Sequence, residues 1–202
     1  MKQLWSPGDC TWAAEPPNWE TGRDTNFLAA RRVLLVTGAS RGLGFAMAQG
    51  LAQAGALAVL NGRDAATLAL RRANIEAAGG QGEIAAFSVC DRAAGDAAIH
   101  AILARHGRLD ILINNAAFGV LRDFFDISDE DWRLSLNVAL DSCFRISRKA
   151  ADGMVAQGWG RIIMISSVNA RIGRATNTPT SPPRLAWKGS RAAWPPRLPP
   201  AA

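Results

Sequence analysis

A glycine-rich stretch is the part of the sequence with the clearest chemical use. Thr37–Gly44 reads Thr-Gly-Ala-Ser-Arg-Gly-Leu-Gly and directly follows the apolar run that begins at Val33. Glycines at these spacings allow a tight turn, close approach of the backbone to a phosphate, and close packing of a helix on a strand. The N-terminal N–H groups of a helix that starts here favour an anion. The stretch therefore predicts a dinucleotide-binding turn, although many such turns carry glycines for structural reasons alone. The expected contacts are Gly38, Ser40, Arg41, Gly42, Leu43 and Gly44.

A second candidate segment, Asn61-Gly62-Arg63, follows the next apolar run. Proteins that bind NAD in this way carry an acid near this position, which hydrogen-bonds the ribose 2′-hydroxyl. No carboxylate is present in the segment. Arg63 and Arg41 offer guanidinium groups, which suit the oxygens of a 2′-phosphate. We therefore expect NADP(H) in preference to NAD(H); the alternative is two ordinary surface arginines.

The elements that must position these residues alternate between strand and helix. Apolar, β-branched runs that end in glycine or a polar residue are typical of buried parallel strands, and helical spacing follows each of the first four. The pattern predicts an α/β fold, a Rossmann-like doubly wound parallel sheet. Strands are expected at Val33–Thr37, Leu57–Asn61, Glu83–Val89, Leu109–Asn114 and Arg161–Ser166. Helices are expected at Leu43–Ala54, Ala65–Ala78, Ala93–His106 and Ser128–Gln157.

Two further motifs follow the fourth and fifth expected strands. Asn114-Asn115-Ala116-Ala117 follows the fourth expected strand and Ser166-Ser167 follows the fifth. With the glycine-rich turn, they resemble the short-chain dehydrogenase/reductase family, over roughly two thirds of the chain from Val33 to Ser167. Ala117 stands where the family pattern has glycine. The resemblance implies that the cofactor contacts also include Asn61, Asp91, Asn115, Ala116 and Ala117. Asp91 could instead be the N-cap of a helix.

The same resemblance implies hydride transfer between a nicotinamide cofactor and an alcohol or carbonyl substrate. Ser167 matches the serine that polarises the substrate oxygen. Asn137 matches the asparagine of the proton path; the alternative for Asn137 is an ordinary polar residue within a helix. The family also uses a tyrosine as general acid and base, with a lysine four residues later that binds the ribose and lowers the pKa of the tyrosine.

The sequence departs from the family at this tyrosine. The chain contains seven Trp and seven Phe but no Tyr. Thr180 and Arg184 stand where the tyrosine and lysine are expected. An aliphatic hydroxyl does not ionise near neutral pH, and the planar guanidinium does not replace a compact ammonium group. The prolines that follow also forbid the helix expected there. The resemblance therefore implies an oxidoreductase by ancestry whose present chain is inactive.

The composition of the C-terminal part indicates a cause. All ten prolines lie in Pro7–Pro17 or Pro179–Pro200, and the formal charge of +6 comes from basic residues after Ala170. A GC-rich coding of Pro179 onward, read one base earlier, can give Tyr-Leu-Ala-Ala-Lys followed by helix-forming residues. We therefore expect a shifted reading frame from about Thr180. Two alternative functions of the chain are a nucleotide-binding pseudoenzyme and, much less favoured, binding of nucleic acid by the basic tail.

The chain divides into three segments on this basis. Residues 1–31 form an N-terminal extension without the features of a signal peptide, 32–170 the NADP-binding domain, and 171–202 a Pro/Arg/Trp-rich tail, with the sheet incomplete at its C-terminal end. No apolar run is long enough to span a membrane. The three cysteines lack metal-ligand spacing, so we expect no metal and a cytoplasmic protein. The intact parent is expected to form homo-oligomers and to act on a small alcohol or carbonyl. The stretch Gly44-Phe-Ala-Met-Ala-Gln-Gly-Leu51, with Asn61-Gly62-Arg63, resembles the gluconate 5-dehydrogenase branch of the family, with the 3-oxoacyl-carrier-protein reductase branch as runner-up.

Overall fold

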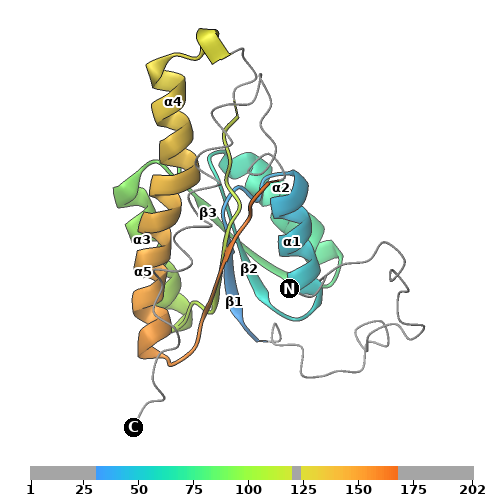
Figure 1. Cartoon of the computed structure of the whole chain (residues 1–202). Helices are drawn as coiled ribbons and strands as arrows, with labels where there is room; N and C mark the ends of the chain where they lie inside the picture. Colours follow the sequence, from blue (N-terminus) through green and yellow to red (C-terminus); the bar gives the residue numbers. More distant parts are fainter. Residues whose placement is uncertain (1–30, 120–123, 168–202) are drawn as a thin grey trace, which may run out of the picture.

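The computed structural model describes residues 31–119 and 124–167 and shows a parallel sheet between two layers of helices (Figure 1). The strands lie in the order β3-β2-β1-β4-β5, and every pairing is parallel. The strands are β1 (Val33–Val36), β2 (Leu57–Gly62), β3 (Gln81–Ala86), β4 (Ile111–Asn114) and β5 (Arg161–Met164), and the helices are α1 (Gly42–Gln53), α2 (Ala65–Ala77), α3 (Arg92–His106), α4 (Asp129–Leu136) and α5 (Ser142–Ala156). The α/β doubly wound fold expected from the sequence is confirmed.

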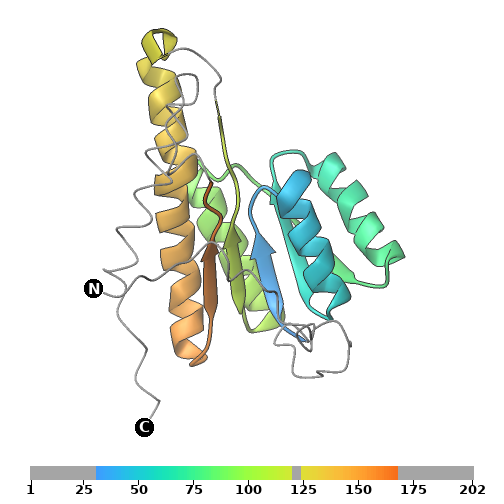
Figure 2. The ribbon, with the colours of Figure 1, turned by 45° about the vertical axis from the view of Figure 1, so that its right-hand side comes forward.

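The side chains of β1 alternate between two cores, one on each face of the sheet. Leu34 and Val36 pack with α1 and α2, whereas Val33 and Leu35 pack with α3 and α5. Figure 2 shows these helix pairs on opposite sides of the sheet. Leu34, Leu35 and Val36 are fully buried, as expected for a central strand of a parallel sheet that is covered on both faces.

The single helix expected over Ser128–Gln157 contains a π-helical turn. Ser128 caps its first turn by accepting a hydrogen bond from the Asp131 N–H. After α4, residues Asn137–Asp141 form the π-helical turn and α5 follows without a break in the helical backbone. The Ser142 hydroxyl donates to the Val138 carbonyl at 2.7 Å. Such bonding to the preceding turn competes with the regular backbone pattern of a helix.

The third strand was expected at Glu83–Val89 and is observed at Gln81–Ala86. Its start pairs with β2 from Gln81, opposite Leu57. Its end is set by a turn in which the Asp91 N–H donates to the Ser88 carbonyl. The other strands and helices lie within two residues of their expected bounds. The error arose because pairing with a neighbouring strand, rather than side-chain pattern, decides where a strand ends.

An ion cluster lies where the strands begin, at the N-terminal end of the sheet, called the amino edge below; the carboxyl edge is the opposite end, where the strands finish. The buried Asp110 carboxylate accepts from the Val33 N–H at 2.8 Å, from Arg32 at 3.1 Å and from Arg108 at 2.6 Å. Burial by itself raises the pKa of Asp110, but the hydrogen bonds from Arg108, the Val33 N–H and Arg32 outweigh burial and hold the pKa below its usual value. Arg32 also stacks on Trp159, with 4.0 Å from its guanidinium carbon to the ring centre. This cluster ties the starts of β1 and β4 together.

Several expectations lie outside the described residues. They include the properties of the N-terminal extension before Arg31, the tail from 171 onward, and the positions Thr180 and Arg184. None of the helices in the described ranges is long and apolar enough to cross a membrane.

Candidate functional site

The glycine-rich turn lies at the carboxyl end of β1, where its glycines have conformations that other residues avoid. Gly38 and Gly42 have φ values of +66° and +58°. A Cβ atom on Gly38 would lie 2.9 Å from the Ala116 Cα. A Cβ atom on Gly44 would overlap the Gly38 carbonyl and the Asn115 amide. The turn is therefore packed directly on the segment after β4, and only glycine fits at these positions.

Thr37 and Asn115 join the turn to β4. The Thr37 hydroxyl accepts from the N–H groups of Asn115 and Ala116, each at 3.0 Å. The Asn115 amide donates to the carbonyls of Thr37 and Gly38 at 3.0 and 3.1 Å. Asn115 and Ala116 thus lie beside the turn, and the contacts of Asn115 within the protein fix the shape of the turn. Their contacts with a cofactor stay a prediction. Ala117 follows and is exposed.

The start of α1 differs from the starts of the helices that follow. Asp64, Asp91 and Ser128 each cap a helix by accepting a backbone N–H. The N-cap of α1 is Arg41, whose side chain makes no capping hydrogen bond, and no acid lies in the first turn. Gly42 has no atom within 4 Å of the place of a Cβ, and Leu43 is 70% exposed. Free N–H groups, a positive helix end and open space above glycine fit the pyrophosphate of a dinucleotide.

The end of β2 lies beside this turn. The Ala39 N–H donates to the Asn61 carbonyl at 2.7 Å. The buried Asn61 side chain donates to the Ala85 and Phe87 carbonyls at 3.1 and 3.0 Å and so connects β2 to β3. These two hydrogen bonds fix the end of β2 beside the turn. A direct contact of Asn61 with the cofactor stays a prediction.

Arg63 is exposed at the same strand end, as is Arg41 in the turn. The acid nearest to Arg63 in the sequence is Asp64, which accepts from the Thr67 N–H at 3.0 Å. This hydrogen bond is the main reason why the pKa of Asp64 lies below its usual value. One oxygen of the exposed Asp64 carboxylate therefore caps α2, next to the exposed Arg63.

Asp91 lies after β3 at the start of α3. Its carboxylate accepts from the Ala94 N–H at 3.0 Å. The structure thus gives Asp91 the helix-capping role that was the alternative to a cofactor contact. One oxygen of the carboxylate makes the cap, so a second role toward a ligand stays a prediction.

Asn137 is the first residue of the π-helical turn. Its side-chain oxygen accepts from Arg145 at 2.8 Å, and the same Arg145 nitrogen lies 3.5 Å from the Val89 carbonyl. Val138 and Ala139, rather than Asn137, are the buried residues of this turn. These contacts favour the alternative reading, a polar residue that stabilises the helix, and a role of Asn137 in a proton path stays a prediction.

Ser167 lies three residues past the end of β5, at the carboxyl edge of the sheet. The register pairs Met164 with Asn114 at the end of β5, and Ser167 is half-buried. Ser167 thus follows β5 at the end of the sheet where the glycine-rich turn follows β1, and its catalytic role stays a prediction. Thr180 and Arg184 lie outside the described residues.

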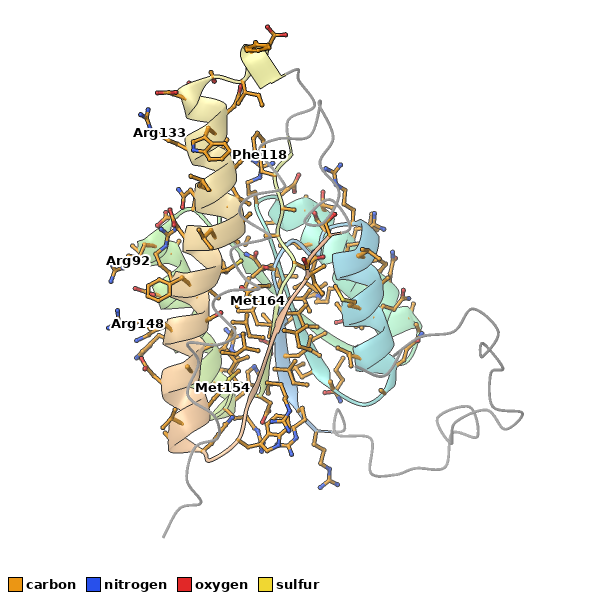
Figure 3. All side chains as sticks on the ribbon, in the orientation of Figure 1. Arg92, Phe118, Arg133, Arg148, Met154 and Met164 are labelled. Carbon is orange, nitrogen blue, oxygen red and sulfur yellow. The ribbon has the colours of Figure 1, made fainter. Side chains whose placement is uncertain are left out.

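Two arginines at this edge were not predicted as site residues. Arg71 on α2 donates to the Ser40 carbonyl, and Arg145 on α5 donates to Asn137. The sequence holds no signal for the Arg71 contact, because its partner lies 31 residues away on another element; the Arg145 contact spans eight residues of one continuous helix and was missed. By contrast, the side chains of Arg92 on α3, Arg133 on α4 and Arg148 on α5 point outward, away from the sheet (Figure 3). Among the described residues, no group of three or more His, Cys, Asp or Glu side chains could hold a metal ion.

The parallel sheet, the glycine-rich turn and the open start of α1 define a Rossmann-type nucleotide-binding domain. The chain matches the short chain dehydrogenase family over residues 32–181. It therefore belongs to the short-chain dehydrogenase/reductase family, as its motifs predicted.

Relatives and solved structures carry the same fold. The chain is 37% identical to gluconate 5-dehydrogenase of Gluconobacter oxydans over 77% of this chain and 59% of that protein. It is 36% identical to the 3-oxoacyl-[acyl-carrier-protein] reductase of Escherichia coli over 70% of this chain and 57% of that protein. A crystal structure of gluconate 5-dehydrogenase from Burkholderia cenocepacia in complex with NADP and tartrate is 35% identical, with a TM-score of 0.75 over 82% of this chain and 66% of that chain. The chain thus spans about three fifths of the length of these two curated relatives.

Proposed function

We propose that this chain binds NADP(H) in the manner of an NAD(P)-dependent oxidoreductase of its family. The observation that carries the proposal is the uncapped start of α1, above a turn in which Gly38 and Gly42 have positive φ values. The pyrophosphate would lie against the N–H groups of this turn. The exposed Arg41 and Arg63 would bind the 2′-phosphate. The NADP bound to the Burkholderia cenocepacia relative supports this choice of cofactor.

The reaction proposed for the intact parent is hydride transfer between NADP(H) and an alcohol or carbonyl carbon. When bound, the nicotinamide supplies or accepts the hydride. Ser167 would donate a hydrogen bond to the substrate oxygen and polarise it. Its place past the end of β5, on the same edge as the turn, supports this role. Asn115 and Thr37 would hold the turn in shape, so their part is positioning rather than chemistry.

We infer that the present chain binds cofactor but does not turn over substrate. No tyrosine occurs anywhere in the sequence, and Thr180 stands where the family has its general acid and base. Oxidation of an alcohol needs a base that accepts the hydroxyl proton, and reduction of a carbonyl needs an acid that donates a proton to the resulting alkoxide. Thr180 does neither near neutral pH. The result is a nucleotide-binding protein without the reductase activity of the family.

Fluorescence titration tests the binding proposal. NADPH is expected to bind the purified full chain, with enhanced or shifted nicotinamide emission, and 2′-phospho-AMP should compete. A steady-state assay with NADP⁺ and a panel of sugar acids and secondary alcohols should show no turnover. Absence of NADPH binding would contradict the proposed function, and turnover at a rate typical of the family would contradict the inferred inactivity.

The proposed cause of inactivity is a shifted reading frame from about Thr180. Sequencing the gene across the codons for Asn177–Arg184 should find a Tyr-x-x-x-Lys reading in the neighbouring frame. A chain restored to that frame should gain dehydrogenase activity, whereas the present chain should not. If the neighbouring frame holds no such motif, the frame hypothesis is wrong, while the binding proposal stands or falls with the titration.

The substrate proposed for the restored chain is a sugar acid such as gluconate. The similarity to gluconate 5-dehydrogenase of Gluconobacter oxydans supports it. The runner-up is a 3-oxoacyl thioester, supported by the similarity to the Escherichia coli reductase. Assays of the restored chain with gluconate and NADP⁺, and with a 3-oxoacyl thioester and NADPH, separate the two. We also propose a cytoplasmic location. The parent is proposed to be a homo-oligomer, and size-exclusion chromatography of the restored chain tests its oligomeric state.

The role of Asn137 is tested by a double-mutant cycle with Arg145. If their 2.8 Å hydrogen bond stabilises the helix, Asn137→Ala and Arg145→Met should each destabilise the fold, with a coupling of about 1 kcal/mol. NADPH affinity should change little. A loss of activity in the restored chain without loss of stability would instead support the proton-path role of Asn137.

A further inference from the structure

Arg71 connects three elements around the glycine-rich turn. It lies on α2, and its Nε donates to the Ser40 carbonyl at 2.9 Å. Its guanidinium carbon lies 5.0 Å from the ring centre of Phe45 on α1. Figure 2 shows α1 and α2 next to one another on the same side of the sheet. One half-buried side chain thus links α2, the turn and the first part of α1.

Ser40 lies where β1 and β2 end side by side. The preceding residue, Ala39, donates its N–H to the Asn61 carbonyl at the end of β2. A Cβ atom on Gly62 would lie 3.5 Å from the Cβ of Ser40. Dinucleotide-binding proteins of this fold read the ribose 2′ substituent at this strand end. The carbonyl that Arg71 engages therefore lies in the region of that substituent.

The chemistry of this carbonyl bears on cofactor choice. A free carbonyl oxygen accepts a hydrogen bond from a hydroxyl group, which favours a ribose 2′-hydroxyl, and repels a phosphate dianion. The Arg71 Nε donates a hydrogen bond to the Ser40 carbonyl, so this oxygen is already engaged. The positively charged guanidinium group lies next to it. One oxygen of the neighbouring Asp64 carboxylate caps α2. Arg71 therefore adds a third arginine to Arg41 and Arg63 around this strand end.

We propose that Arg71 is a positioning residue that makes this site selective for the 2′-phosphorylated dinucleotide. It fixes the Ser40–Arg41 segment and blocks the carbonyl that would otherwise bind a 2′-hydroxyl. This inference rests on the proposed cofactor binding and adds a residue to it. The prediction is specific: the loss of Arg71 changes the preference between NADPH and NADH, rather than dinucleotide binding in general.

The experiment compares the affinities of the full-length wild type, Arg71→Gln and Arg71→Lys for NADPH and NADH by fluorescence titration. Arg72→Gln is the matched control, because Arg72 is the next residue on α2 and pairs with Glu76 at 3.4 Å, away from the turn. In Arg71→Gln, the ratio of NADPH to NADH affinity should fall about tenfold, as expected for loss of a hydrogen bond to a charged group. Arg71→Lys keeps the charge but lacks the planar guanidinium, so its ratio of NADPH to NADH affinity should lie between those of wild type and Arg71→Gln. Arg72→Gln should keep the wild-type ratio.

The outcomes separate this inference from the proposed function. If wild type binds neither dinucleotide, the proposed function fails and the inference fails with it. If wild type prefers NADPH and Arg71→Gln keeps that preference, the inference alone is overturned. Equal loss of both affinities would show that Arg71 merely supports the fold, and this too would overturn it. Thermal unfolding of each variant confirms that the compared proteins are folded.

Discussion

The amino and carboxyl edges of the sheet both carry arginines, and the two edges use them differently. At the amino edge, Arg32 and Arg108 are paired with the buried Asp110. At the carboxyl edge, Arg41 and Arg63 are exposed, and neither forms an ion pair with the described part of the chain. A paired charge in a buried place stabilises the fold because removing either partner leaves the other without compensation. An unpaired cation beside open helix N–H groups is available to an anionic ligand.

The two edges also differ in how their backbone is held. Asp110 fixes the start of β1 through a charged acceptor. Thr37 and Asn115 fix the glycine-rich turn through neutral groups. These neutral clamps add no negative charge beside the glycine-rich turn, and the carboxylates at this edge, Asp64 and Asp91, cap α2 and α3 instead. We therefore expect mutations at the amino edge to change stability and mutations at the carboxyl edge to change cofactor binding.

The largest effect is expected for Asp110→Ala. The change leaves Arg32, Arg108 and the Val33 N–H without their acceptor. The free energy of unfolding should fall by about 3 kcal/mol, the range found when one partner of a buried ion pair is removed. Urea denaturation measures it. Asp129→Ala removes a carboxylate that is 88% exposed and should change stability by less than about 0.5 kcal/mol. Equal effects of the two changes would contradict the contrast between the edges.

Gly44→Ala should act mainly on cofactor binding. Its Cβ would overlap the Gly38 carbonyl and the Asn115 amide, so the turn must shift, with a cost of about 1–3 kcal/mol as in other overpacked sites. NADPH titration should show a large loss of affinity. Gly50→Ala is the matched control on the same helix, since a Cβ there meets no atom within 4 Å. It should bind NADPH normally and unfold at a slightly higher temperature. Normal binding by Gly44→Ala would argue against this turn as the phosphate site.

A moderate effect is expected for Thr37→Val, which keeps the shape of the side chain and removes its hydroxyl. The N–H groups of Asn115 and Ala116 would lose their acceptor. Stability should fall by about 1–2 kcal/mol, and NADPH affinity should fall because the turn loses its clamp. Thr37→Ser retains the hydroxyl and should recover most of both. If Thr37→Val weakens the fold without affecting affinity, the clamp does not shape the binding turn.

The smallest effect is a pH dependence of stability from the amino edge. The pKa of Asp110 in the folded protein lies below its usual value. A lowered pKa means that the stabilisation is fully present above the pKa of the unfolded chain, about 3.9, and is lost as the pH falls through the folded-state value. The difference in unfolding free energy between wild type and Asp110→Asn should therefore shrink below about pH 4. If the difference in unfolding free energy between wild type and Asp110→Asn stays constant from pH 7 to pH 3, the ionised Asp110 carboxylate is not the source of the stabilisation.

Much of the fold could be predicted from the sequence. Buried parallel strands read as apolar runs, and glycines marked the turns between them, so the alternation and fold class followed directly. The bounds of β3 could not be predicted, because its start depends on pairing with β2 and its end on the turn at Ser88–Asp91. The π-helical turn at Asn137 was also missed, because a hydroxyl that bonds to the preceding turn leaves no periodic signal.

For the site, residue types and order along the chain determined the glycine-rich turn, the arginine in place of an acid after β2, and the missing tyrosine. These depend on local chemistry, which a sequence states directly. Only the tertiary structure decided that Arg71 meets the Ser40 carbonyl and that Thr37 clamps Asn115. The partners in these pairs are 31 and 78 residues apart. They meet because strand order and register, set by packing on both faces of the sheet, bring the ends of separate strands to one edge.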